Sequence, residues 1–212
     1  MKPNFTRIAI ILDRSGSMES CKESTVAGFN EFIRNQKLLP GEATVKLVQF
    51  DDQYETVFDE PLKRCPELSQ STFVPRGSTA LLDAQGRTIV ELGQELAALA
   101  EAERPSKVIV VTLTDGLENA SKEYDLEKIG EMIREQRDKY NWDFVFLGAN
   151  QDAIATAAAM SIPMPSAMSY STSGAGVAAT MAAVSNYVGA ARGGRAAAFS
   201  KEDRKAAMDK EA

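Results

Sequence analysis

Three short polar segments of this 212-residue sequence carry oxygen atoms that could bind a hard metal ion. The first presents one carboxylate, Asp13, and two hydroxyls, Ser15 and Ser17, at alternating positions. The second ends in the hydroxyl of Thr79, and the third carries the carboxylate of Asp115. Mg²⁺ prefers an octahedral shell of oxygen ligands and keeps several waters in it. Two carboxylates and three hydroxyls would nearly neutralise such an ion and leave part of its shell open.

Each polar segment adjoins an element with a clear hydrophobic pattern. The first follows residues 5–12, a continuous apolar run typical of a strand that is covered on both faces, and it precedes an amphipathic helix over 19–37. The second begins a long helix over 79–101, and the third follows 107–114, the most strand-like run of the chain. We expect these two apolar strands to be central, parallel neighbours, with the first and third polar segments at the same edge of the sheet.

The remaining patterns continue the alternation of strands and helices. Asp51 and Asp52 are interpreted as turn residues of a hairpin whose second strand, 54–58, alternates like an exposed edge strand. This order predicts an α/β fold: a doubly wound, mostly parallel central sheet with helices on both faces and one antiparallel edge strand. Ligands of such sheets bind at the carboxyl ends of the strands, where all three polar segments are expected. The other predicted elements are strands over 43–50 and 143–147 and helices over 125–140, 151–160 and 174–191.

The composition divides the chain into three parts. Residues 1–165 carry the strands and the three polar segments. Residues 166–198 are an extension rich in Ala and Gly, and the apolar stripe of the helix over 174–191 predicts that this helix packs on the domain. Residues 199–212 form a charged tail, which we expect to be a frayed helix or disordered.

Taken singly, each polar segment also has an ordinary structural interpretation. The segment from Asp13 to Ser17 is typical of a strand-to-helix turn with a serine N-cap. Thr79 alone is typical of a helix cap, and Asp115 followed by glycine is typical of a turn. Only the three together, in this order and at the ends of these elements, indicate a metal site.

The combination of Asp-x-Ser-x-Ser, Gly-Ser-Thr and Thr-Asp-Gly resembles the von Willebrand factor type A domain over about residues 5–160. The resemblance implies a Rossmann-like fold and a metal-ion-dependent adhesion site. In that site Ser15, Ser17 and Thr79 would supply hydroxyl ligands, and Asp13 and Asp115 would act directly or through waters. The ion would be Mg²⁺, or Mn²⁺ or Ca²⁺ in its place, and an Asp or Glu of a protein partner would complete its shell.

The function implied by this resemblance is a non-catalytic module for metal-dependent protein–protein interaction. The short chain looks like a stand-alone intracellular member of the family, of the kind found in bacterial and phage-related gene sets. The alternative is a Mg²⁺-dependent phosphoryl-transfer enzyme that uses Asp13, as haloacid-dehalogenase phosphatases use the first Asp of Asp-x-Asp. Position 15 is Ser here, and no His is present to replace the second acid, so we expect no enzyme. A nucleotide- or redox-binding protein ranks last, because no glycine fingerprint follows the first strand.

Composition excludes several further classes. The absence of His removes Ser-His-Asp, Cys-His and His-metal chemistry. The net charge is −6, from 24 basic and 30 acidic residues, so the chain lacks the excess of basic residues that is typical of proteins with a nucleic-acid partner. No apolar run has the roughly 18 residues of a membrane helix, and no signal-peptide pattern is present. We therefore expect a cytoplasmic protein without a membrane partner, and the oligomeric state stays open.

Other residues near the polar segments receive different roles. Arg14 is expected either to face solvent or to contact a partner. Glu118 and Asn119 follow the third segment and are interpreted as loop residues. Cys21 and Cys65 are too few for a disulfide framework and are expected to be reduced, partly buried thiols.

Overall fold

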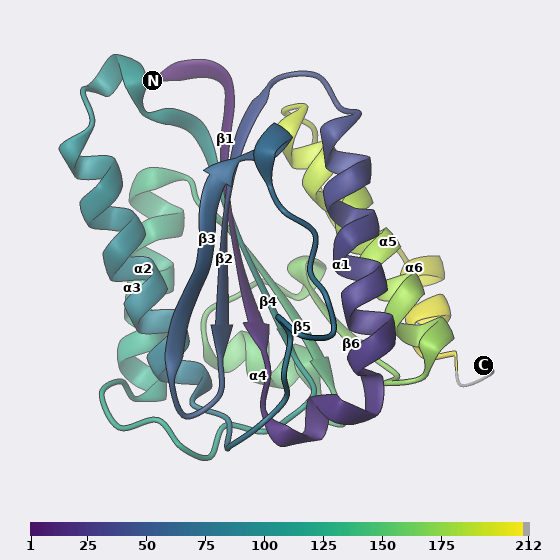
Figure 1. The fold of residues 1–212 in the computed structure, drawn as a ribbon. Coiled ribbons are helices and arrows are strands. Elements are labelled where there is room, and N and C mark those ends of the chain that lie inside the picture. The colour runs from purple at the N-terminus through teal and green to yellow at the C-terminus, as the bar shows by residue number, and fades with distance from the viewer. Residues whose placement is uncertain (210–212) are drawn as a thin grey trace.

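A six-stranded sheet forms the centre of the computed structural model, which describes residues 1–209 (Figure 1). The strand order is β3-β2-β1-β4-β5-β6, and every neighbouring pair is parallel except β2 and β3. This is the predicted doubly wound α/β sheet with one antiparallel edge strand. The strands are β1 (Lys2–Asp13), β2 (Glu42–Phe50), β3 (Tyr54–Pro61), β4 (Pro105–Thr114), β5 (Asp143–Ala149) and β6 (Ala167–Tyr170).

The strands β1 and β4 are central and parallel, as predicted from their apolar runs. Their register pairs Ile11 with Thr112 and Leu12 with Leu113, so both strands end at the same edge of the sheet. From residue 108 onward β4 is buried on both faces, and β1 is buried from Thr6 onward. Asp13 and Thr114 follow this last pair and therefore lie side by side at the ends of the two strands.

Helices cover both faces of the sheet (Figure 1). Alternate residues of β1 point to opposite faces, so Ile8, Ile10 and Leu12 pack on one side while Ala9 and Ile11 pack on the other. Helices on the first side are α1 (Lys22–Lys37), α5 (Gly174–Arg192) and α6 (Lys201–Ala207). Helices on the second side are α2 (Leu81–Ala98), α3 (Leu126–Tyr140) and α4 (Ala153–Ala159).

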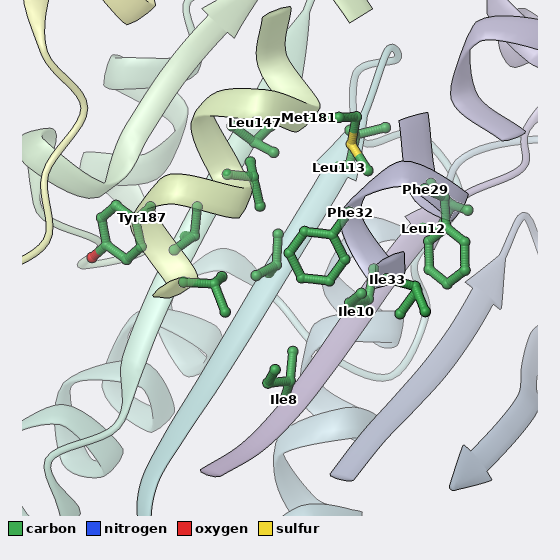
Figure 2. Close-up of a cluster of buried hydrophobic side chains, with 14 of the residues drawn as sticks. Ile8, Ile10, Leu12, Phe29, Phe32, Ile33, Leu113, Leu147, Met181 and Tyr187 are labelled. Atoms are coloured by element: carbon green, nitrogen blue, oxygen red, sulfur yellow. The ribbon is translucent and has the colours of Figure 1, made fainter. Parts of the chain in front are cut away.

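The first face is filled by side chains from β1, α1 and α5. Figure 2 shows Phe29, Phe32 and Ile33 of α1 pointing toward the side chains of the sheet, with Met181 of α5 beside them. The two helices approach closely, because a Cβ atom on Gly28 would lie 2.7 Å from Cγ of Met181. This close packing fixes α5, which lies beyond residue 165, on the same core as α1.

The helix over 174–191 packs on the domain as expected, but one strand beyond residue 165 was not predicted. The sequence patterns predict no strand after 143–147, whereas β6 pairs in parallel with β5. This strand has only four residues and no β-branched residue, so its sequence gives no strand signal. The division at residue 165 is thus a change of composition within one sheet and one core.

Over its described residues the tail forms a helix that begins after Ser200, one of the two expected alternatives, and this helix is packed on the domain rather than frayed. Phe199 is buried, with its ring centroid 5.2 Å from that of Tyr187. The helix α6 begins with a capping box between Ser200 and Asp203, which satisfies free N–H groups of its first turn. Residues 210–212 of the predicted tail lie outside the described residues.

Three shorter findings complete the fold. Among the described residues, no helix combines the length and the apolar composition needed to cross a bilayer. Cys21 and Cys65 are both free, and both are buried rather than partly buried as predicted. The predicted helix over 19–37 begins as a 3-10 helix, η1 (Gly16–Cys21), before α1.

Candidate metal centre

The three polar segments meet at the carboxyl ends of β1 and β4. The hydroxyl of Ser17 donates to Oδ1 of Asp115 over 2.5 Å and lies 3.2 Å from Oγ of Ser15. Gly116 lies against the same hydroxyls: a Cβ atom there would be 3.0 Å from Oγ1 of Thr79 and 3.6 Å from Oγ of Ser17. A side chain at position 116 would therefore fill the space between the three segments.

Asp13 forms the floor of this site. It is fully buried, and its two carboxylate oxygens accept hydrogen bonds from the Ser15 N–H at 2.7 Å and the Thr114 hydroxyl at 2.5 Å. Burial raises the pKa of Asp13 to about 6, although both hydrogen bonds act in the opposite direction. The negative charge of Asp115 adds to the increase. The site therefore holds Asp13 in place but disfavours its charged form.

Asp115 lies in the same electrostatic situation. It is 2% exposed, and burial raises its pKa even though Ser17 donates a hydrogen bond to it. No Lys or Arg within residues 1–209 forms an ion pair with Asp115 or Asp13. Two buried carboxylates that lack a cationic partner cost free energy when ionised. A divalent cation between them would remove that cost.

The loop that carries Thr79 is held by its neighbours on both sides. The Gly77 carbonyl accepts a hydrogen bond from the Gly16 N–H at 3.2 Å. The backbone of Gly77 has a positive φ of 66°, which glycine adopts without strain. Asn119 accepts from the Thr79 N–H at 2.9 Å and donates its own N–H to the Thr79 carbonyl at 3.0 Å. The second and third polar segments are thus fixed to each other by one hydrogen bond to the Asn119 side chain and one between backbone groups.

Glu118 anchors the start of α2. Its carboxylate accepts hydrogen bonds from the N–H groups of Leu82, Ala120 and Ser121. The loop role that the sequence predicts for Glu118 and Asn119 is confirmed: they position the neighbours of the oxygen cluster rather than adding to it.

Arg14 lies inside the protein, so the expectation of a solvent-facing or partner-contacting side chain is wrong. It is 6% exposed, and its guanidinium donates to Asp51 at 3.1 Å and to Glu55 at 2.6 Å. Arg76 donates to the same Asp51 oxygen at 2.8 Å. Sequence gives no sign of this arrangement, because it depends on pairing between three separate loops.

Asp51 is the turn residue that was expected, and it is also fully buried. Its side chain accepts from the Gln53 N–H at 2.6 Å, which closes the turn between β2 and β3. Burial alone would raise the pKa of Asp51, but hydrogen bonds from Arg76 and Gln53 and the charge of Arg14 outweigh it and lower the pKa. The cations beside the site are therefore committed to Asp51 and do not compensate Asp13 or Asp115.

The donor set fits a hard divalent cation. Every converging group is an oxygen atom, the ligand that such ions prefer. Asp13, Ser15 and Thr79 are buried, whereas Ser17 and Ser78 are exposed, so the cluster has one side open to solvent. Over residues 1–209 no cluster of three or more His, Cys, Asp or Glu could hold a metal. The hydroxyls of Ser15, Ser17 and Thr79 would therefore supply most of the protein ligands.

One supporting residue was absent from the predicted site. The sequence pattern places Thr114 only within a polar segment, yet its hydroxyl donates a hydrogen bond to Oδ2 of Asp13. The sequence pattern does indicate this contact, because Thr114 is the last residue of a predicted strand that should lie beside the strand ending at Asp13. All five predicted site residues are brought together at this edge. They are Asp13, Ser15, Ser17, Thr79 and Asp115.

Residues 8–118, just over half of the chain, match the family model described as the von Willebrand factor type A domain. No curated protein matches the sequence. Solved structures share the fold, among them the ArnB paralog VWA2 from Sulfolobus acidocaldarius, with a TM-score of 0.52 and 18% identity over 84% of this chain and 44% of that one. A von Willebrand factor type A protein from Catenulispora acidiphila gives 0.55 and 14% over 88% and 42%.

A third similar structure has a metal ion in its site. It is proximal thread matrix protein 1 from the mussel byssus, with a zinc-occupied MIDAS motif, at a TM-score of 0.59 and 15% identity over 89% of this chain and 47% of that one. This chain spans less than half the length of the three proteins it resembles.

Proposed function

Because this chain belongs to the von Willebrand factor type A domain family, we propose that its oxygen cluster is a metal-ion-dependent adhesion site that binds a partner protein. The observation that carries the proposal is the pair of buried carboxylates, Asp13 and Asp115, without a cationic partner in the described residues. The zinc-occupied motif of the mussel protein supports the same use of this fold. Mg²⁺ is the proposed ion, with Mn²⁺ or Ca²⁺ as substitutes.

The five residues would have different roles at the ion, according to their burial and to the groups that they already contact. Ser15, Ser17 and Thr79 would hold the ion with their hydroxyls, and Asp115 would balance its charge from beside Ser17. Asp13 already accepts two hydrogen bonds, which suits a carboxylate that acts through water. When bound, the ion supplies an electrophilic position that an external carboxylate can fill.

The proposed partner group is an Asp or Glu side chain. Two protein carboxylates match the charge of a divalent ion, but a carboxylate that acts through water lies further from the ion than a direct ligand. With Asp13 in that position and neutral hydroxyls as the remaining ligands, the ion would keep attraction for another anion. A desolvated bond from a partner carboxylate to the ion would lie at the centre of the interface, where binding energy concentrates.

Affinity capture with and without Mg²⁺ tests this function. Native protein should retain a partner in Mg²⁺ and release it in chelator, and Thr79→Ala should lose that partner while its circular dichroism stays native. Ser78→Ala is the matched control, because Ser78 is the exposed neighbour of Thr79. Replacing the partner's contacting Asp or Glu by its amide should abolish binding. A partner indifferent to chelator and to Thr79→Ala would show that the interface lies elsewhere.

Proton and metal binding should compete at Asp13. Its pKa in the folded protein, about 6, exceeds the value of 3.8 for an unperturbed Asp, so protonation favours the folded state. The contribution of Asp13 to the metal-free protein is therefore largest at low pH and is lost as pH rises through that interval. We expect Mg²⁺ to raise the melting temperature more at about pH 7.5 than at about pH 5.

Thermal melts at both pH values, with and without Mg²⁺, check this competition. Asp52→Ala should behave as the native protein, because Asp52 is an exposed neighbour of the site. A Mg²⁺ effect of equal size at both pH values would contradict an ion that binds beside Asp13.

We further propose that the site performs no phosphoryl transfer. Both oxygens of Asp13 accept hydrogen bonds from the protein, which does not suit a nucleophile, and Ser15 occupies the position where an acid–base carboxylate would be needed. With Mg²⁺ or Mn²⁺, we expect hydrolysis of phosphate monoesters and nucleoside triphosphates to stay at the background rate. Turnover that disappears in Asp13→Asn would establish the enzyme instead.

A further inference from the structure

Three consecutive backbone carbonyls around Asp115 each accept a hydrogen bond from a side chain further along the sequence. The donors come from the end of β5 and from β6, the two strands beyond β4 in the sheet. The bonds run from the Tyr170 hydroxyl to the Thr114 carbonyl at 3.2 Å, from Nδ2 of Asn150 to the Asp115 carbonyl at 3.3 Å, and from Nε2 of Gln151 to the Gly116 carbonyl at 3.0 Å.

Two of these donors, Gln151 and Tyr170, are themselves held in place. Oε1 of Gln151 accepts from the Thr156 hydroxyl in α4 at 3.1 Å, and its backbone carbonyl accepts from the Ala153 N–H at 3.0 Å. Tyr170 is 2% exposed and packs in the core beneath the oxygen cluster. The chain of contacts therefore connects the backbone of Asp115 to α4 and β6, which are rigid elements of the fold.

We infer that Asn150, Gln151 and Tyr170 are positioning residues of the metal centre, an inference that rests on the proposed function. They hold the peptide groups on both sides of Asp115, so that its carboxylate stays at Ser17. All three lie outside residues 8–118, the part that matches the family model. The segment beyond the family match thus contributes to the site through the backbone of a ligand residue.

The position of Asp115 should affect small and large ions differently. Groups that orient a metal ligand commonly change metal affinity by about 10–100-fold when they are removed. Mg²⁺ requires near-ideal octahedral geometry, whereas Ca²⁺ accepts variable geometry and longer bonds. Loss of the hydrogen bonds to the carbonyls of residues 114–116 should therefore weaken Mg²⁺ binding more than Ca²⁺ binding.

Calorimetric titration of Mg²⁺ and of Ca²⁺ into three variants of the full chain tests this role. Gln151→Met removes the donor and keeps the length of the side chain, and Tyr170→Phe removes only the hydroxyl. Gln94→Met is the matched control, because Gln94 is exposed on α2 and no hydrogen bond of its side chain is found within residues 1–209. The first two variants should bind Mg²⁺ about tenfold more weakly. Their Ca²⁺ affinity should change less, and the control should match the native protein.

The outcomes separate this inference from the proposed function. If Gln151→Met and Tyr170→Phe both bind Mg²⁺ with the affinity of the native protein, the positioning role alone is overturned. Equal weakening of Mg²⁺ and Ca²⁺, with a lower melting temperature of the metal-free variants, would assign these residues to fold stability and overturn it too. Native protein that binds neither ion would overturn the proposed function and, with it, this inference. If Gln151→Met does not fold, Tyr170→Phe decides the question, because it leaves the packing of the ring intact.

Discussion

Replacing Asp13 with alanine should abolish the increase in melting temperature that we expect Mg²⁺ to give the native protein. Free ion at about 100 times its dissociation constant stabilises a folded protein by about 2.7 kcal/mol, which for a chain of this size corresponds to about 5–10 °C. In the variant, one of the two carboxylates that balance the ion is gone, and the cluster retains only Asp115 as an anion. Differential scanning calorimetry with and without Mg²⁺ measures the effect.

The same substitution should not weaken the metal-free protein at neutral pH by the amount usual for a buried polar residue. Because burial raises the pKa of Asp13, its charged form opposes folding, and alanine removes that cost. The loss of the hydrogen bonds from Ser15 and Thr114 acts in the opposite direction. Asp52→Ala, a nearby exposed carboxylate, should keep the full Mg²⁺ response. An identical Mg²⁺ response in Asp13→Ala would mean that the ion acts at another place.

Asp51→Ala should lower the free energy of unfolding by about 3–5 kcal/mol, the cost of breaking a buried ion pair by removing one partner. Asp51 is fully buried and accepts from both Arg14 and Arg76. Nη2 of Arg14 is already buried without a hydrogen-bond partner in the described residues. Without Asp51, the charge of Arg14 would depend on Glu55, whose side chain is 56% exposed.

Chemical denaturation of the variant and of Asp52→Ala checks this prediction. The control removes a carboxylate from the next position, where the side chain is exposed, so its free energy of unfolding should stay within about 0.5 kcal/mol of the native value. Loss of less than about 1 kcal/mol in Asp51→Ala would show that the two arginines find other partners.

The centre of the sheet and the position of the site could be predicted from the sequence because both follow from one rule. The apolar runs before Asp13 and Asp115 have no polar face, which requires strands that are covered on both sides. Parallel strands of this kind end at the same edge, so the two carboxylates had to be close. Pattern and connectivity were therefore sufficient to bring together residues that are about 100 positions apart in the chain.

The rest depends on contacts that have no local pattern. Arg14 is buried because Asp51 and Glu55 reach it from another turn, and nothing in its own neighbourhood indicates that pairing. The strand β6 is too short to show a period, so the support that Tyr170 gives to the third polar segment could not be predicted. The capping box of α6 differs from these contacts because it does have a local pattern: its Ser and Asp stand three positions apart in the sequence.

The most direct test of the metal centre is a crystal structure grown with Mn²⁺, with anomalous scattering used to locate the ion. We predict an anomalous peak among the five converging side chains, with hydroxyl oxygens at metal–ligand distances of about 2.0–2.2 Å and one position open to water or to a carboxylate from solution. The predicted surrounding residues are Asp13, Ser15, Ser17, Thr79 and Asp115. A saturated crystal with no peak at this edge of the sheet, or with its peak elsewhere, would contradict the proposed function.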